Sequence, residues 1–156
     1  MLKKGFTLVE LLAVIVILAV IALITTPIII DSLNTSKKEA FKDSVNSLIK
    51  ITQNYYAGIT YNDEGLLPVK ITYNNKTPTA KGINKNNTCK AISKNILDYS
   101  GENPDSGSIL ITKEGKVSFA LYNKNLNTCV QKGENDKTAE FVDKSESECK
   151  ITQNAC

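Results

Sequence analysis

The chain lacks histidine, tryptophan and arginine, and these absences exclude several classes of function. Without histidine, it has neither the commonest general base nor the commonest metal ligand. Without arginine, the bidentate contacts that recognise guanine or phosphate are excluded, and the lysines are scattered among acidic residues rather than clustered. No nucleophile–base pair stands out either. We therefore predict a protein that is not an enzyme and that uses no metal and no cofactor.

Cysteine is scarce, and all of it lies in the polar part of the chain: Cys89, Cys129, Cys149 and Cys156. No pair has C-x-x-C spacing, which disfavours zinc and thioredoxin-type sites. An even number of cysteines in a small domain that follows an apolar segment predicts two disulfides and an oxidising compartment. Four cysteines allow three pairings. Of these we favour Cys89–Cys129 together with Cys149–Cys156.

Polar residues are almost absent between Phe6 and Ile30. As a helix, this segment spans about 37 Å, which exceeds the about 30 Å of a bilayer's hydrocarbon core. Lys3 and Lys4 precede it, so we expect the N-terminus to stay in the cytoplasm and the polar part to lie outside. No small-x-small cleavage site follows the run, which disfavours an ordinary secretory signal. A lipoprotein leader needs a cysteine at the end of the apolar run, and the first cysteine is Cys89.

Two residues of this apolar run, Glu10 and Pro27, are unfavourable in a membrane helix and need an explanation. A carboxylate such as that of Glu10 costs up to about 2.5–3.5 kcal/mol in lipid, so a plain membrane anchor leaves it unexplained. Pro27 removes one helical hydrogen bond and predicts a bend, and the hydroxyls of Thr25 and Thr26 are placed to satisfy carbonyls that it frees. The alternative for Pro27 is a simple kink that a membrane helix tolerates.

The order of residues around these positions resembles the processing motif of type IV prepilins and pseudopilins: Lys3-Lys4-Gly5-Phe6-Thr7-Leu8-Val9-Glu10-Leu11-Leu12. The resemblance covers about the first thirty residues. It implies that prepilin peptidase cleaves after Gly5 and that the new N-terminal Phe6 is N-methylated. It also implies that Glu10 is the residue through which subunits assemble. Pro27 lies where the family tends to carry a proline.

The resemblance implies a structural subunit of a type IV pilus-like filament, with a role in adhesion, motility or DNA uptake. The alternative is a pseudopilin of a type II secretion or competence machine, and a third hypothesis is a membrane-anchored binding domain that never polymerises. The implied partners are other copies of itself or related pilins, prepilin peptidase, an inner-membrane assembly platform and, before assembly, membrane lipid. Nucleic acid is a partner only in a DNA-uptake role. The implied location is a single-pass membrane protein with an extracytoplasmic head, and later a filament at the cell surface or in the envelope.

Beyond Asp31 the sequence becomes amphipathic with a helical period, because apolar residues recur three or four positions apart. These residues are Phe41, Val45, Leu48, Thr52, Tyr55 and Ile59. We predict one helix from Phe6 to Ala57, which ends at Gly58 and whose second half packs on a globular head.

The predicted fold is α+β: a long N-terminal helix on a small antiparallel sheet, with a pilin-like layout. Residues 108–112 and 116–122 predict a hairpin around Gly115, and 138–142 a third strand. Most of residues 60–87 is predicted as loop, and residues 87–97 as a short helix capped by Thr88. The chain then divides into a leader (1–5), an assembly half of the helix (6–30), an amphipathic half (31–57) and a head (58–156). The family often pins the C-terminal region of the head with a disulfide.

Overall fold

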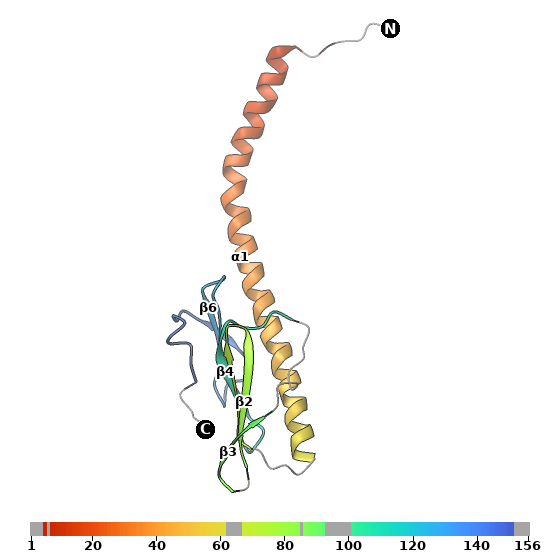
Figure 1. Cartoon of the computed structure of the whole chain (residues 1–156). Coiled ribbons are helices and arrows are strands. Elements are labelled where there is room, and N and C mark those ends of the chain that lie inside the picture. Colours follow the sequence, from red (N-terminus) through yellow and green to blue (C-terminus); the bar gives the residue numbers. More distant parts are fainter. Residues whose placement is uncertain (1–4, 6, 62–66, 85, 93–100, 152–156) are drawn as a thin grey trace. The chain divides into compact units, whose positions relative to one another are not determined.

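The fold consists of one long helix and one antiparallel sheet (Figure 1). The structure, a computed structural model, describes residues 5, 7–61, 67–84, 86–92 and 101–151. Its elements are α1 (Leu8–Tyr61), β1 (Val69–Asn74), β2 (Thr77–Ile83), β3 (Cys89–Ile92), β4 (Ser106–Ile111), β5 (Val117–Asn123), β6 (Thr128–Lys132) and β7 (Glu140–Val142). The chain separates into two compact units, Met1–Lys37 and Lys38–Cys156, and α1 contributes to both.

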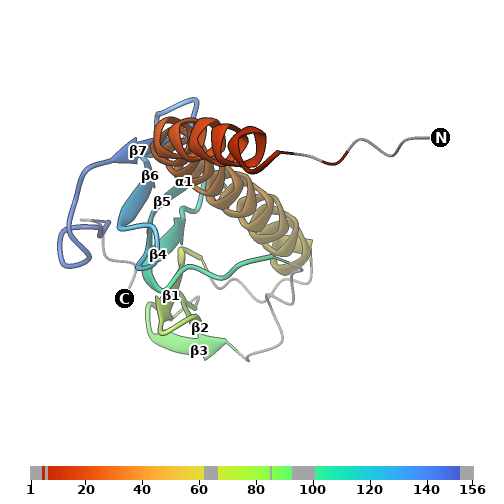
Figure 2. The ribbon, with the colours of Figure 1, turned by 90° about the horizontal axis from the view of Figure 1, so that it is seen from above.

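The sheet is antiparallel throughout, and its strand order is β3-β2-β1-β4-β5-β6-β7 (Figure 2). Neighbouring strands pair in sequence order except that β4 pairs with β1, which places the β1–β2–β3 meander at one edge. The predicted α+β class, with a long helix and an antiparallel sheet, is confirmed. The sheet is larger than predicted, since it has seven strands rather than three.

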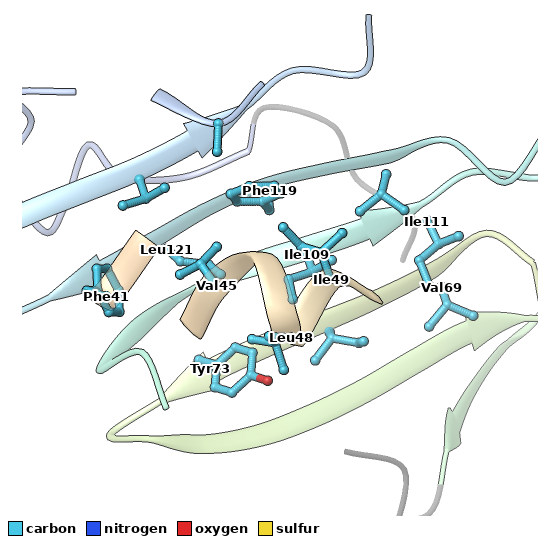
Figure 3. Packing of buried hydrophobic residues seen from close by; sticks show 14 residues of the cluster. Phe41, Val45, Leu48, Ile49, Val69, Tyr73, Ile109, Ile111, Phe119 and Leu121 are labelled. Carbon is cyan, nitrogen blue, oxygen red and sulfur yellow. The ribbon is translucent and has the colours of Figure 1, made fainter. Parts of the chain in front are cut away.

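The core of the head lies between one face of the sheet and the second half of α1 (Figure 3). The helical stripe predicted from the sequence is the stripe that packs: Phe41, Val45, Leu48 and Thr52 are at most 2 % exposed. They meet alternate residues of the central strands, among them Phe119 of β5. Since side chains alternate across a strand, the other residues of these strands face away from α1.

The helix runs past its predicted end. We expected it to stop at Ala57 because Gly58 follows, yet α1 ends at Tyr61. A glycine inside a helix costs only about 1 kcal/mol relative to alanine, and Gly58 lies on an exposed part of α1. Tyr55, three residues before Gly58, packs against the core and favours continuation of the helix.

Residues 60–87 are not mostly loop, because they contain β1 and β2. β1 alternates strictly between buried Val69, Ile71 and Tyr73 and more exposed polar residues. The tight turn to β2 places Asn75 and Lys76 at φ angles of 47° and 62°, as a two-residue hairpin requires. β2 was hard to predict because its inward positions hold poor strand formers such as proline and glycine.

The short helix predicted over residues 87–97 is also wrong where the structure describes it, because Cys89–Ile92 forms strand β3. Thr88 does not cap a helix. Its backbone N–H and its hydroxyl donate to Oδ1 of Asn84, both at 2.9 Å, and they close a turn instead. Residues 93–97 lie outside the described residues. The hairpin of β4 and β5 is confirmed, and Gly115 takes a φ of 78° in its turn.

The predicted disulfide pairing is wrong. Cys129 of β6 is bonded to Cys149, with their Cα atoms 5.9 Å apart. Both sulfurs belong to a second buried cluster, with Ala120 and Tyr122, on the face of the sheet that points away from α1. Cys89 is disulfide-bonded as well, and Cys156 lies outside the described residues. The Cys129–Cys149 bond fixes the C-terminal segment, residues 143–151, to this outer face.

A local turn also shapes this C-terminal segment. The hydroxyl of Ser145 donates to Oε2 of Glu148 at 2.6 Å, and the Ser145 N–H donates to the same atom at 3.1 Å. These bonds stabilise the charged carboxylate, so the pKa of Glu148 lies below its ordinary value.

We expect replacement of Ser145 by alanine to raise the pKa of Glu148 towards its ordinary value, as followed by NMR titration of the carboxyl carbon. Because the folded-state pKa is below the unfolded one, the stabilisation is complete at neutral pH and is lost as pH falls through the folded pKa. Ser147→Ala is the matched control, since the Ser147 hydroxyl contacts that of Ser145 at 3.1 Å. Equal pKa values in the wild type and Ser145→Ala would contradict this account.

Candidate assembly site

The first half of α1 buries none of its side chains within the chain. Every described residue from Gly5 to Ala40 is exposed. The large apolar side chains between Leu8 and Leu33 are 48 % to 81 % exposed. A surface of this kind and size has to be covered by lipid or by protein. By length and composition alone, α1 is able to cross a membrane.

Glu10 lies in the first turn of this helix and is fixed by its own chain. Thr7, the residue before α1, donates its backbone N–H to Oε2 of Glu10 at 2.9 Å and its hydroxyl to the same atom at 2.8 Å. In return, the Glu10 N–H donates to the Thr7 hydroxyl at 3.3 Å. This reciprocal arrangement is a capping box, which satisfies N–H groups that a helix start leaves unpaired.

The capping box decides where the negative charge of Glu10 lies. It holds the carboxylate at the N-terminus of α1, where the helix dipole favours an anion. A carboxylate can accept about four hydrogen bonds, so two bonds from Thr7 leave capacity for a further donor. The site therefore presents an oriented, exposed carboxylate at the start of the apolar half of α1.

Thr7 was not among the residues predicted for this site, although the sequence contained the signal. The pattern Thr7-x-x-Glu10 ahead of an apolar run is the sequence pattern of a capping box.

Gly5 is exposed and unconstrained. A side chain built on it would meet no atom within 4 Å, so the fold gives no steric reason for a glycine at this position. Phe6, the predicted methylated residue, lies outside the described residues.

Pro27 lies inside α1, and the helix continues through it. The carbonyl that loses its helical donor is that of Leu23, four residues earlier. The hydroxyls of Thr25 and Thr26 donate instead to the carbonyls of Ile21 and Ala22, at 3.0 and 2.6 Å. The expectation that they satisfy the freed carbonyl is therefore not met by these bonds. Such back-bonds weaken and bend helices, so three successive residues loosen this turn.

Residues 1–26 match the family model of the prokaryotic N-terminal methylation motif. This segment is the prepilin-type signal of type IV pilins and pseudopilins. It contains Gly5, Thr7 and Glu10, and it ends one residue before Pro27. No curated protein and no solved structure matched the chain. The signal supports a structural protein of the pilin and pseudopilin class rather than an enzyme.

Among the described residues, no group of three histidine, cysteine, aspartate or glutamate side chains is placed to hold a metal ion.

Proposed function

We propose that the chain is a structural subunit of a type IV pilus-like filament. The observation that carries this proposal is the prepilin-type signal on a helix whose apolar side chains between Leu8 and Leu33 are exposed. In this proposal, prepilin peptidase cleaves after Gly5 and methylates the new N-terminal Phe6. An inner-membrane platform then transfers the helix from lipid into a bundle of neighbouring copies or related pilins. The head, residues 58–156, is extracytoplasmic and lies on the filament surface.

The proposed role of Glu10 follows from charge. Cleavage after Gly5 creates a positive amino group on Phe6 in apolar surroundings, and a neighbouring subunit's Glu10 can neutralise it. At 4 Å and an effective dielectric constant near 20, such a pair gains about 4 kcal/mol before the cost of desolvation. Because desolvation takes back much of this gain, the pair acts mainly to fix register. Affinity comes from burial of the apolar helix surfaces.

Mass spectrometry of the mature protein, purified from its own membrane, tests this proposal. We expect the chain to begin at Phe6 and to carry one additional methyl group. An intact N-terminus, or cleavage beyond the apolar run, would reject prepilin processing. A Gly5→Leu variant provides the matched control, and we expect it to stay uncleaved although the fold has room for the side chain.

The same processing is expected of a pseudopilin of a secretion or competence machine, so processing does not separate the two roles. Electron microscopy of cells does. Long surface filaments that bind an antibody to the head support the pilus subunit. Short fibres that stay within the envelope, without long surface filaments, support the pseudopilin.

A further inference from the structure

The two edges of the sheet lie at opposite ends of the head and differ in charge (Figure 2). β3 forms one edge and β7 the other, and among the described strands each pairs with a single neighbour, β2 or β6. The outer side of each edge strand therefore presents backbone groups that no further described strand pairs with. Both edges lie within the unit Lys38–Cys156.

The β3 edge is basic. Residues 65–97, which include β1, β2 and β3, contain six lysines and no aspartate or glutamate. Lys70 and Lys76 are engaged in contacts of their own. Lys81 of β2 and Lys90 of β3 are exposed, and neither ammonium group has a hydrogen bond or an ion pair within the described part of the chain. These two lysines give the edge its uncompensated positive charge.

The β7 edge is acidic. Residues 133–148, which surround β7, contain six acidic residues and two lysines. Four of the six acids already accept a hydrogen bond or form an ion pair: Glu134, Asp136, Glu146 and Glu148. The other two, Glu140 of β7 and Asp143 just beyond it, are exposed. Neither of these two carboxylates has such a partner among the described residues, so they give the edge its uncompensated negative charge.

Charge on edge strands has an ordinary explanation, because natural sheets use it to keep their edges from pairing with other chains. That explanation does not require opposite signs on the two edges. When the signs are opposite, each edge repels the same edge of another copy and attracts the other edge. Contacts between two β3 edges or two β7 edges are therefore disfavoured, whereas contact of a β3 edge with a β7 edge is favoured.

We propose that the β3 edge of one head contacts the β7 edge of a neighbouring copy of this chain. In this contact, the ammonium groups of Lys81 and Lys90 face the carboxylates of Glu140 and Asp143. The inference rests on the proposed function, since it gives the filament subunits a second contact besides the N-terminal helix.

The geometry of this contact suits a filament. It joins two different surfaces, so each copy that has bound one neighbour still presents its other edge to the next, and an open helical assembly results. A single pair of exposed charges contributes little. Repetition of the contact along the filament makes many weak pairs effective together, while their charges fix which edges meet.

Carbodiimide crosslinking of filaments from wild-type cells tests the contact. The reagent joins a lysine to an aspartate or glutamate only where the two side chains already touch. β2 and β3 are five and six strand spacings from β7, about 24 and 29 Å, so one chain cannot crosslink its own two edges. We expect peptide mass spectrometry to find Lys81 or Lys90 joined to Glu140 or Asp143. The same lysines should not be joined to Glu114, an exposed acid in the β4–β5 turn.

Charge reversal separates this contact from an effect on folding. The variant Glu140→Lys/Asp143→Lys makes both edges basic and should lower the amount of sheared filaments at least about tenfold, because like charges then meet. Adding Lys81→Glu/Lys90→Glu to the same chain makes the edges complementary again and should restore the filaments. Glu114→Lys, which reverses an exposed charge away from both edges, should assemble like the wild type.

The outcomes also separate this contact from the proposed function. Wild-type filaments without these crosslinks would overturn the contact and leave the filament role intact. The same conclusion would follow if the quadruple variant assembled no better than Glu140→Lys/Asp143→Lys. A wild-type chain that formed neither filaments nor crosslinked oligomers would overturn both proposals.

Discussion

Replacement of Glu10 by alanine is expected to abolish filament formation while the head remains folded. In the proposed filament each Glu10 neutralises the amino group of a neighbouring Phe6. Removing one partner of a buried pair costs about 3–5 kcal/mol, because the other charge stays buried and unpaired. At about 1.4 kcal/mol per factor of ten, assembled filaments should fall at least about a hundredfold. Shear fractions probed with an antibody to the head measure this loss.

The capping box supplies matched variants that separate charge from helix capping. Glu10→Gln keeps a side chain that can accept a bond from Thr7 but removes the charge, so we expect assembly to fail as in Glu10→Ala. Thr7→Ser keeps the hydroxyl that donates to Glu10 at 2.8 Å and should assemble normally. Thr7→Ala keeps the charge but frees the carboxylate, and an intermediate loss is expected.

A Glu10→Ala chain that forms normal filaments would refute the pairing with Phe6. The third hypothesis, a membrane-anchored binding domain that does not polymerise, would instead be favoured if the wild-type chain formed no filaments and no crosslinked oligomers. Circular dichroism and thermal unfolding of the same variant in micelles verify that the head is intact, which we expect because Glu10 is exposed and contacts only the start of α1.

The N-terminal region was predictable because its signals are local. A helical period, two lysines ahead of an apolar run and a ten-residue motif can be recognised without knowing which residues are neighbours in space. The stripe from Phe41 to Thr52 was predicted for the same reason, and it is the stripe that packs on the sheet. Thr7 was the exception. Its role as the capping partner of Glu10 was not predicted, although the spacing of the two residues is sufficient to predict it.

The head was predictable only where strands are locally apolar. β4 and β5 were found because apolar residues flank a glycine turn. β1 and β2 were missed because both are half polar, and their stability comes from pairing with each other and with β4, which lies more than twenty residues away. β3 was misassigned because a threonine before alternating residues also predicts a helix cap. Pairings between distant segments depend on loop closures that a sequence pattern does not contain.

The disulfide pairing failed for a related physical reason. Four cysteines allow three pairings that the sequence does not distinguish, and the favoured bond from Cys89 to Cys129 is wrong. In the fold, Cys89 lies at one edge of the sheet, on β3, while Cys129 lies on β6 near the other edge. Two cysteines can be bridged only when their Cα atoms lie within about 7 Å. Cys149 meets this condition with Cys129, because the C-terminal segment crosses the outer face.

Removing the Cys129–Cys149 disulfide is expected to cause a large loss of head stability. The bond closes a loop with a sequence separation of 20 residues. In the chain-entropy model, such a loop contributes about 3 kcal/mol to the free energy of unfolding. The variant Cys129→Ala/Cys149→Ala should lose about this amount in urea unfolding of the full chain in micelles. Ser147→Ala, on the same segment, should lose much less.

Because of its position, loss of the disulfide should affect the sheet as well as the C-terminal segment. Cys149 is 1 % exposed and packs with Ala120 and Tyr122, so the disulfide holds down the cover of the outer face of β5 and β6. Without it, the side-chain contacts that hold residues 143–151 to the head include the half-exposed Lys124–Glu146 pair and the bond from Lys144 Nζ to Oε1 of Gln131 on β6. Exposed ion pairs contribute about 1 kcal/mol or less. We therefore expect the double variant to lose protection from amide exchange first on β6, while β1 and β4 stay protected. Unchanged stability and unchanged exchange on β6 would show that the outer cluster holds the segment without its covalent bond.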